Sequence, residues 1–286
     1  MRRLVALHRW WGVAFCLLFS AWFASGLVMH FVPFPARNAD RGSGAVHSAD
    51  AARVIAAAFA RAHGIDAGAA VVERVARDQW TVGGDYDGDR PLYRVALNDA
   101  AGTVLHVSSR TGAVVLVTTF RTRALNYFGA VTHWIYPTVL RQHRAPWRAV
   151  VWSLSLVATL GAALGVVVGA VRLIRICRDL APPHRGLRAW HHYAGLVCAP
   201  FILAFAFSGW LSMDDGLLFP PGSTARAELF AALHTLRFGP LASSPGLRTI
   251  VIVVLCLGGL AFSLTGVIMA WRHVAGASSR SSSRPE

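Results

Sequence analysis

The sequence predicts an all-α membrane bundle of four transmembrane helices, with a small α+β domain inserted between the first and second helices. Hydrophobic residues make up 55% of the 286 residues, which is too apolar for an ordinary soluble domain. Four windows lack acidic and basic residues, and each is long enough to cross roughly 30 Å of hydrocarbon as a helix. These windows are Trp10–Ala36, Ala149–Val171, Ala189–Met213 and Thr249–Trp271.

The distribution of positive charge predicts how the helices are oriented. The chain has 28 basic residues, all of them arginine, against 14 acidic ones. The arginines gather before the first helix, between the second and third, and after the fourth. These regions share one side of the membrane if the helices alternate, and the positive-inside rule makes that side the cytoplasm. We therefore expect cytoplasmic termini and a lipid bilayer as partner, and the charge indicates no nucleic-acid partner.

The N-terminal apolar stretch is expected to stay in the protein as the first helix. Arg2 and Arg3 resemble the start of a signal peptide, but the stretch after them is longer than the ~7–15 apolar residues of a typical signal sequence. No small-x-small cleavage motif ends it.

The segment after the first helix has the pattern of a small folded domain. The spacing of its apolar residues predicts a helix over 49–64, ending at a glycine. Strand-like stretches follow, separated by turns that contain Asp and Gly, and they predict a small antiparallel sheet. The predicted strands are 79–84, 91–98, 102–109 and 112–120.

Part of this segment resembles the module called PepSY, in which a strand, a turn, a second strand and an ending of the form TGxV recur. That part is YRVALNDAAGTVLHVSSRTGAVV. With the motifs LHRWWG and LHTLRFG and the four apolar windows, most of the chain resembles the PepSY-associated transmembrane helix family. Some members of that family are haem-containing ferric-siderophore reductases of the bacterial inner membrane. The resemblance implies that location for this chain, with the PepSY-like domain outside the cytoplasm.

These patterns divide the chain into eight segments. They are 1–32, the first transmembrane helix; 33–125, the extracytoplasmic PepSY-like domain; 126–175, an interfacial segment and the second transmembrane helix; 176–188, a cytoplasmic loop; 189–213, the third transmembrane helix; 214–248, an extracytoplasmic loop; 249–273, the fourth transmembrane helix; and 274–286, a disordered cytoplasmic tail.

An internal duplication relates the first two helices to the last two. The pattern H-x3-G-x12-S-G begins at His8 and again at His191. In the same way, His133 and His234 each precede a glycine, Gly165 or Gly266, by 32 residues. Two copies with the same orientation predict two parallel-repeat helix pairs, related by an axis along the membrane normal.

The duplication selects candidate ligands for haem iron. His8 and His191 are expected at the cytoplasmic ends of the first and third helices, where two neutral imidazoles facing each other across the axis suit axial ligation. His133 and His234 are the second, outer pair. His30 and Met213 are an alternative outer pair, since they also occupy equivalent positions. His192 points about 100° away from His191 around a helix and is the poorer ligand.

The remaining histidines favour simpler roles. Those of the domain between the first and second helices, His47, His63 and His106, are expected on its surface. No nucleotide-binding, flavin or hydrolase motif is evident in the sequence, so any electron donor is a separate molecule.

The function predicted from these residues is that of an inner-membrane b-type haem protein with one or two haem b groups. It would pass electrons from an unidentified cytoplasmic donor to an extracytoplasmic acceptor. The resemblance implies that this acceptor is a ferric chelate or ferric siderophore, and the activity that of a ferric reductase. The alternative is a non-enzymatic module, in which the PepSY-like domain binds a peptidase, peptide or envelope partner and the helices only anchor it. A transporter is disfavoured, because the apolar windows contain no acidic residue.

Overall fold

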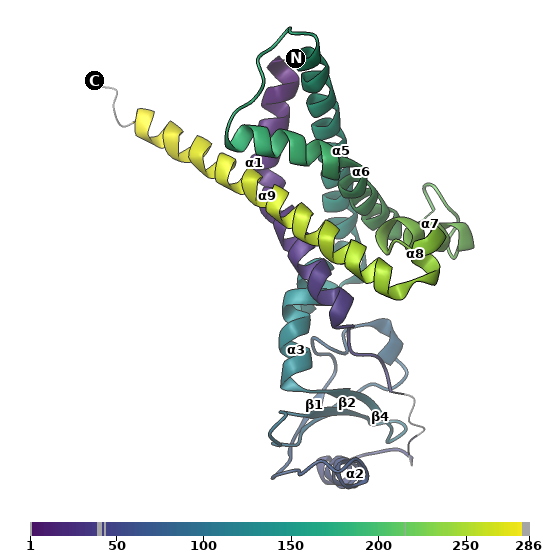
Figure 1. Cartoon of the computed structure of the whole chain (residues 1–286). Coiled ribbons are helices and arrows are strands. Elements are labelled where there is room, and N and C mark those ends of the chain that lie inside the picture. The colour runs from purple at the N-terminus through teal and green to yellow at the C-terminus, as the bar shows by residue number, and fades with distance from the viewer. Residues whose placement is uncertain (1, 39–41, 43, 215, 282–286) are drawn as a thin grey trace. The chain divides into compact units, whose positions relative to one another are not determined.

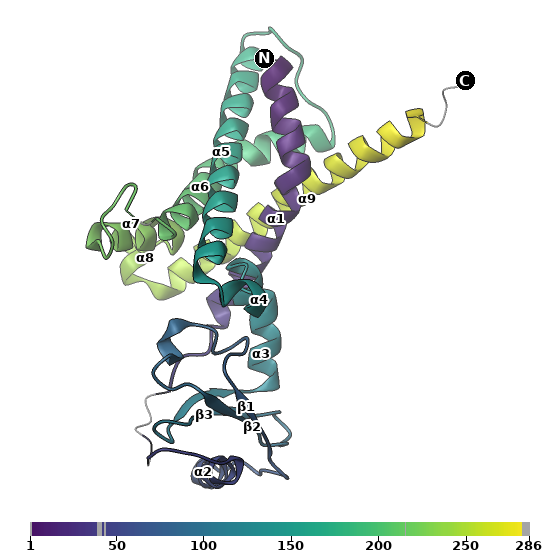
Figure 2. The same cartoon turned by 180° about the vertical axis from the view of Figure 1, so that it is seen from behind.

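The structure is a computed structural model that describes residues 2–38, 42, 44–214 and 216–281. The chain divides into two compact units. The first, here called the helical unit, comprises Met1–Leu27 and Arg148–Glu286. The second, here called the sheet unit, comprises Val28–Trp147. Each is described by itself (Figures 1 and 2).

Four long helices build the helical unit, and each is long and apolar enough to cross a membrane. The predicted bundle of four such helices is confirmed. The last helix continues past the predicted end at 273, and residues 282–286 of the predicted tail lie outside the described residues. The long helices are α1 (Arg2–Phe31), α5 (Arg144–Cys177), α6 (Leu187–Ser212) and α9 (Pro245–Ser281), and the shorter ones after α6 are α7 (Thr224–His234) and α8 (Gly239–Ser243).

Glycines let the long helices approach closely. A Cβ atom added at Gly161 of α5 would lie 1.8 Å from the indole nitrogen of Trp11 on α1. One added at Gly259 of α9 would lie 2.5 Å from the ring of Phe23, also on α1. Glycine is the residue that permits such contact between helices in a bilayer, where packing replaces the hydrophobic effect. Gly169 and Gly195 make similar contacts from α5 to α6 and from α6 to α9, so each long helix touches two others.

The sheet unit is a four-stranded antiparallel sheet with a helix on one face. The strands lie in the order β1-β2-β3-β4, as β1 (Val71–Val75), β2 (Leu92–Ala96), β3 (Val104–Ser108) and β4 (Val114–Thr118). Helix α2 (Ala49–Ala62) begins at Ser48, whose hydroxyl caps the N–H of Ala51. Its buried alanines pack on Val95, Leu105 and Val107 of the sheet. The predicted helix-then-sheet order is confirmed (Figure 1).

The predicted strand at 79–84 is wrong. The first strand is instead β1, which pairs antiparallel with β2. The Asp78 carboxylate accepts hydrogen bonds from the N–H groups of Trp80 and Thr81, both at 3.0 Å. This local bonding bends the chain into a turn and competes with strand pairing, as Asp often does. A short 3₁₀ helix, η1 (Gly84–Tyr86), follows.

A helical segment follows β4. It consists of α3 (Phe120–Asn126), the π-helical turn η2 (Tyr127–Val131) and α4 (Thr138–Arg141). The segment starts with a capping box between Thr119 and Thr122. The fully buried Asn126 donates to the carbonyl of Pro33 at 3.2 Å, which ties the segment to the chain after α1. The segment thereby forms part of the sheet unit.

Candidate functional site

The structure brings His8 and His191 together inside the helical unit. Their ring centroids lie 6.4 Å apart, with 44° between the ring planes. Both rings line a cavity of about 1290 Å³ between α1, α5, α6 and α9. That volume exceeds the ~300–1,000 Å³ of typical ligand pockets. The cavity therefore offers two histidines and room for a large ligand.

The separation of the two rings would allow both imidazoles to bind one metal ion. An imidazole nitrogen binds a transition metal at about 2.0–2.1 Å, and the ring centre lies about 1 Å further out, so two imidazoles on opposite sides of one metal have centroids about 6 Å apart. The observed 6.4 Å agrees with this spacing. The donor set fits haem iron, which two neutral imidazoles bind without adding charge to an apolar site.

A hydroxyl group orients His191 and selects its tautomer. The Thr265 hydroxyl donates to the carbonyl of Phe262 at 2.6 Å, so its oxygen accepts from Nδ1–H of His191 at 2.8 Å. The proton therefore resides on Nδ1, and Nε2 carries the lone pair that a metal needs. The ring of Phe262 stacks on His191 with centroids 4.6 Å apart. Hydroxyl and ring together hold the imidazole in one orientation.

His8 is held by packing rather than by a hydrogen bond. Its Nδ1 atom is buried and has no hydrogen-bond partner among the described residues. The ring lies against Gly165 of α5, where an added Cβ would be 3.0 Å from Cε1 of His8. His191 lies against Gly266 of α9 in the same way, at 3.8 Å. Gly165 and Gly266 are equivalent positions in the sequence duplication. His8 and His191 therefore occupy equivalent places in the two copies.

The walls of the cavity differ between the two copies. A Cβ atom added at Gly12 would meet nothing within 4 Å, so the backbone of α1 borders open space there. At the equivalent Gly195 an added Cβ would lie 2.8 Å from the ring of Phe262. A flat ligand therefore has access to the α1 backbone near His8, while the aromatic ring covers the corresponding part of α6.

The outer candidate His234 is also held by a hydroxyl group. The Ser208 hydroxyl donates to the carbonyl of Ala204 at 2.6 Å and is placed to accept from Nδ1 of His234 at 3.0 Å. Phe230 stacks on the ring with centroids 4.8 Å apart. Burial lowers the pKa of His234, so the ring is neutral near pH 7. The serine of the repeated Ser-Gly motif is thus a hydrogen-bond partner of His234.

The other outer candidates are distributed over both units. His133 and His30 belong to the sheet unit, where both are half-buried, and the ring of His30 makes an edge contact with Phe31. Met213 caps the end of α6 in the helical unit, which also contains His234. The outer pairs His133/His234 and His30/Met213 therefore stay predictions.

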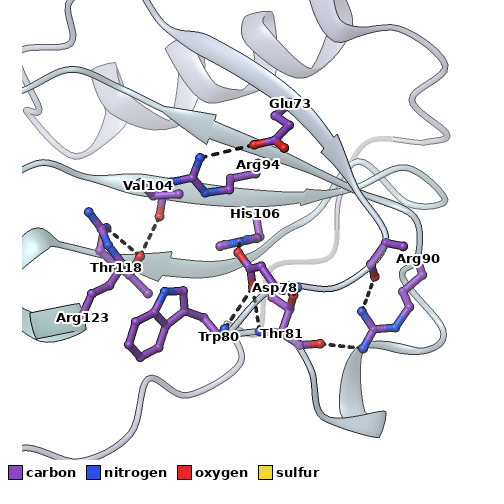
Figure 3. A network of polar contacts seen from close by, with 11 residues as sticks. Glu73, Asp78, Trp80, Thr81, Arg90, Arg94, Val104, His106, Thr118 and Arg123 are labelled. Carbon is purple, nitrogen blue, oxygen red and sulfur yellow. Dashed lines mark hydrogen bonds and ion pairs between the residues drawn. The ribbon is translucent and has the colours of Figure 1, made fainter. Parts of the chain in front are cut away.

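The sheet unit contains a histidine–carboxylate pair that sequence reasoning missed. His106 was expected on the surface, but its side chain is fully buried, and Nε2 lies 2.6 Å from the Asp78 carboxylate. The Asp78 side chain is 19% exposed and also bonds the turn at Trp80 and Thr81 (Figure 3). Burial by itself would raise the pKa of Asp78, but the hydrogen bonds and charge of these partners lower it to about 2. The sequence contained one signal, the alternation of side chains along β3, which assigns His106 to a face of the sheet. Alternation does not show what covers that face, so it could not predict that His106 is buried.

Comparisons of the chain with protein-family models, with curated proteins and with solved structures give no match. The functional argument consequently depends on the geometry of the site.

Proposed function

We propose that the protein is a b-type haem protein of the bacterial inner membrane that passes electrons to an acceptor outside the cytoplasm. The observation that carries the proposal is the pair His8 and His191, whose ring centroids lie 6.4 Å apart and which both line a large cavity. The four membrane-compatible helices supply the required position in a bilayer. Haem b bound there supplies reversible one-electron transfer.

The residues around the pair have separable tasks. His191 presents Nε2 because Thr265 holds the proton on Nδ1. Phe262 restricts the rotation of that ring by stacking on it. Gly165 lets His8 approach α5, and Gly12 leaves space beside the α1 backbone.

The distribution of arginine supports the side of the membrane on which electrons would enter the protein. His8 and His191 lie near the helix ends that carry most of the arginines of the helical unit, and the positive-inside rule assigns those ends to the cytoplasm. A reduced donor in the cytoplasm would lose one electron at this site. The resemblance to the PepSY-associated family supports a ferric chelate or ferric siderophore as the acceptor, with Fe³⁺ reduced to Fe²⁺. The softer, less charged Fe²⁺ is held more weakly by oxygen ligands.

The experiment that tests the proposal is a pyridine-haemochrome measurement on the full-length protein, expressed with added haem precursor and purified in detergent. We expect one haem b per chain, or two if His234 also binds one, with the spectrum of a six-coordinate low-spin iron. A well-folded chain with no haem would overturn the proposal and favour the membrane-anchored PepSY module that binds a protein or peptide partner.

A further inference from the structure

One end of the cavity is lined by positive charge. Among the described residues that line it, seven are arginines and none is acidic. All ion pairs among the described residues lie in the sheet unit, so these arginines have no acidic partner within the part of the chain that the structure describes. The seven are Arg2, Arg9, Arg172, Arg175, Arg185, Arg188 and Arg272.

Two buried nitrogen atoms at this end of the cavity have no hydrogen-bond partner among the described residues. The Nε atom of Arg172 and the Nε2 atom of His192 are buried and make no hydrogen bond to any described residue. The Nη2 atom of Arg172 donates to the carbonyl of Pro182 at 2.8 Å, which ties the guanidinium to the loop between α5 and α6. A buried polar group without a hydrogen-bond partner is unfavourable. A ligand with acceptor atoms would remove that cost.

A second imidazole completes the cluster. The ring of His184, in the same loop, lies 5.3 Å from the ring of His192 in an edge contact. Burial lowers the pKa of His184, and the positive charges of Arg172 and Arg188 lower it further. The arginines Arg172 and Arg188 thus lie close enough to His184 to affect it, and such positive charges are unfavourable together unless an anion lies among them.

Orientation in the membrane does not explain this arrangement. An arginine that serves the positive-inside rule needs only to reach the headgroup region, and its donors are then satisfied by water. Arg172 instead has a buried N–H group without a hydrogen-bond partner, and its guanidinium is held by the Pro182 carbonyl. The ring nitrogen Nε2 of His192 is likewise buried and makes no hydrogen bond to a described residue. These features are typical of a preformed binding site for an anion.

We infer that Arg172, His184 and His192 bind an anionic oxygen group, a carboxylate or a phosphate, that enters the cavity from its arginine-rich end. The group has two possible sources in a membrane. One is a propionate of haem b, and this source rests on the proposed function. The other is the phosphate of an anionic phospholipid, which does not. In either case His192 binds the anion; where the source is a haem propionate, its neighbour His191 is the proposed metal ligand.

The test compares Arg172→Gln with Arg178→Gln, an exposed arginine of the same region that does not line the cavity. In the first arm, haem-free protein is reconstituted with haem b or with its dimethyl ester, and haem loss to apomyoglobin is timed. If a propionate is bound, Arg172→Gln speeds the loss of haem b about 10- to 100-fold, as expected for one charge-assisted hydrogen bond. The ester, which has no charge, then leaves both variants at the same rate.

In the second arm, native mass spectrometry counts phosphatidylglycerol bound to each variant. If a phospholipid is bound, Arg172→Gln loses one lipid that wild type and Arg178→Gln retain, and its haem loss is unchanged. Equal behaviour of Arg172→Gln and Arg178→Gln in both arms overturns the inference. A wild-type protein that takes up no haem refutes the proposed function, but the lipid arm still decides whether the anion site exists.

Discussion

Replacing His191 by alanine will remove one haem per chain, because this residue is the proposed ligand whose ring orientation is best defined. The Thr265 hydroxyl already fixes the proton on Nδ1, and no other donor replaces the lost nitrogen from the same helix face. The same loss is expected for His8→Ala, since one remaining imidazole leaves the iron with a single protein ligand. Pyridine-haemochrome analysis and the low-spin optical spectrum of the purified variants measure the effect.

Two controls make this result specific. His63→Ala removes an exposed histidine of the sheet unit and should leave the haem content unchanged. Adding free imidazole to His191→Ala should restore part of the low-spin spectrum, because the deleted ring leaves a space of its own shape. Unchanged haem content in both His8→Ala and His191→Ala would contradict the assigned ligands while leaving open a haem elsewhere.

Replacing Asp78 by alanine will destabilise the sheet unit by about 1–3 kcal/mol, the usual cost of leaving a buried polar group without its hydrogen-bond partner. The change leaves the buried His106 without its carboxylate and frees the N–H groups of Trp80 and Thr81. Hydrogen exchange of the β3 amides in the full-length protein measures the loss of protection. Asp87→Ala is the matched control, because that side chain is 58% exposed and its ion pairs with arginine are worth less than about 1 kcal/mol. Equal protection in the two variants would show that the buried pair adds no stability.

The same carboxylate predicts how the sheet unit responds to acid. The pKa of Asp78 is lowered to about 2 in the folded protein, from an ordinary value of 3.8. A lowered pKa means that the stabilisation is complete above about pH 4 and is lost as the pH falls toward 2. At about 1.4 kcal/mol per pKa unit, the loss is about 2–3 kcal/mol. Exchange protection measured between pH 5 and pH 2 should therefore decline more steeply in wild type than in Asp78→Asn.

Much of the architecture can be predicted from the sequence, because the signals are local. A charge-free window of transmembrane length identifies a membrane helix whatever its neighbours are, and the structure has its four apolar helices at these windows. The duplicated histidine and glycine spacing likewise pairs His8 with His191 before any contact is known. The helix at α2 follows from its apolar spacing and its serine cap.

The sequence predictions were wrong where a side chain makes hydrogen bonds that neither composition nor strand alternation indicates. The stretch 79–84 has the composition of a strand, but the Asp78 carboxylate holds it as a turn. His106 alternates correctly along β3, yet only its packing shows that it is fully buried. In both places the Asp78 carboxylate makes the contact that the sequence did not predict, with the N–H groups of Trp80 and Thr81 and with His106. The sequence does not indicate which donors a carboxylate will contact.

The sequence by itself determined the membrane helices, the candidate ligands and their duplication, because periodicity, charge and spacing are properties of the chain in one dimension. Only the tertiary structure decided which nitrogen of His191 is presented, that Phe262 covers Gly195, and that Arg172 and His192 have donors or acceptors without partners. Thr265 follows His191 by 74 residues in the sequence, and the two side chains meet only because α9 packs against α6. Contacts between helices depend on how surfaces fit, which no local pattern records.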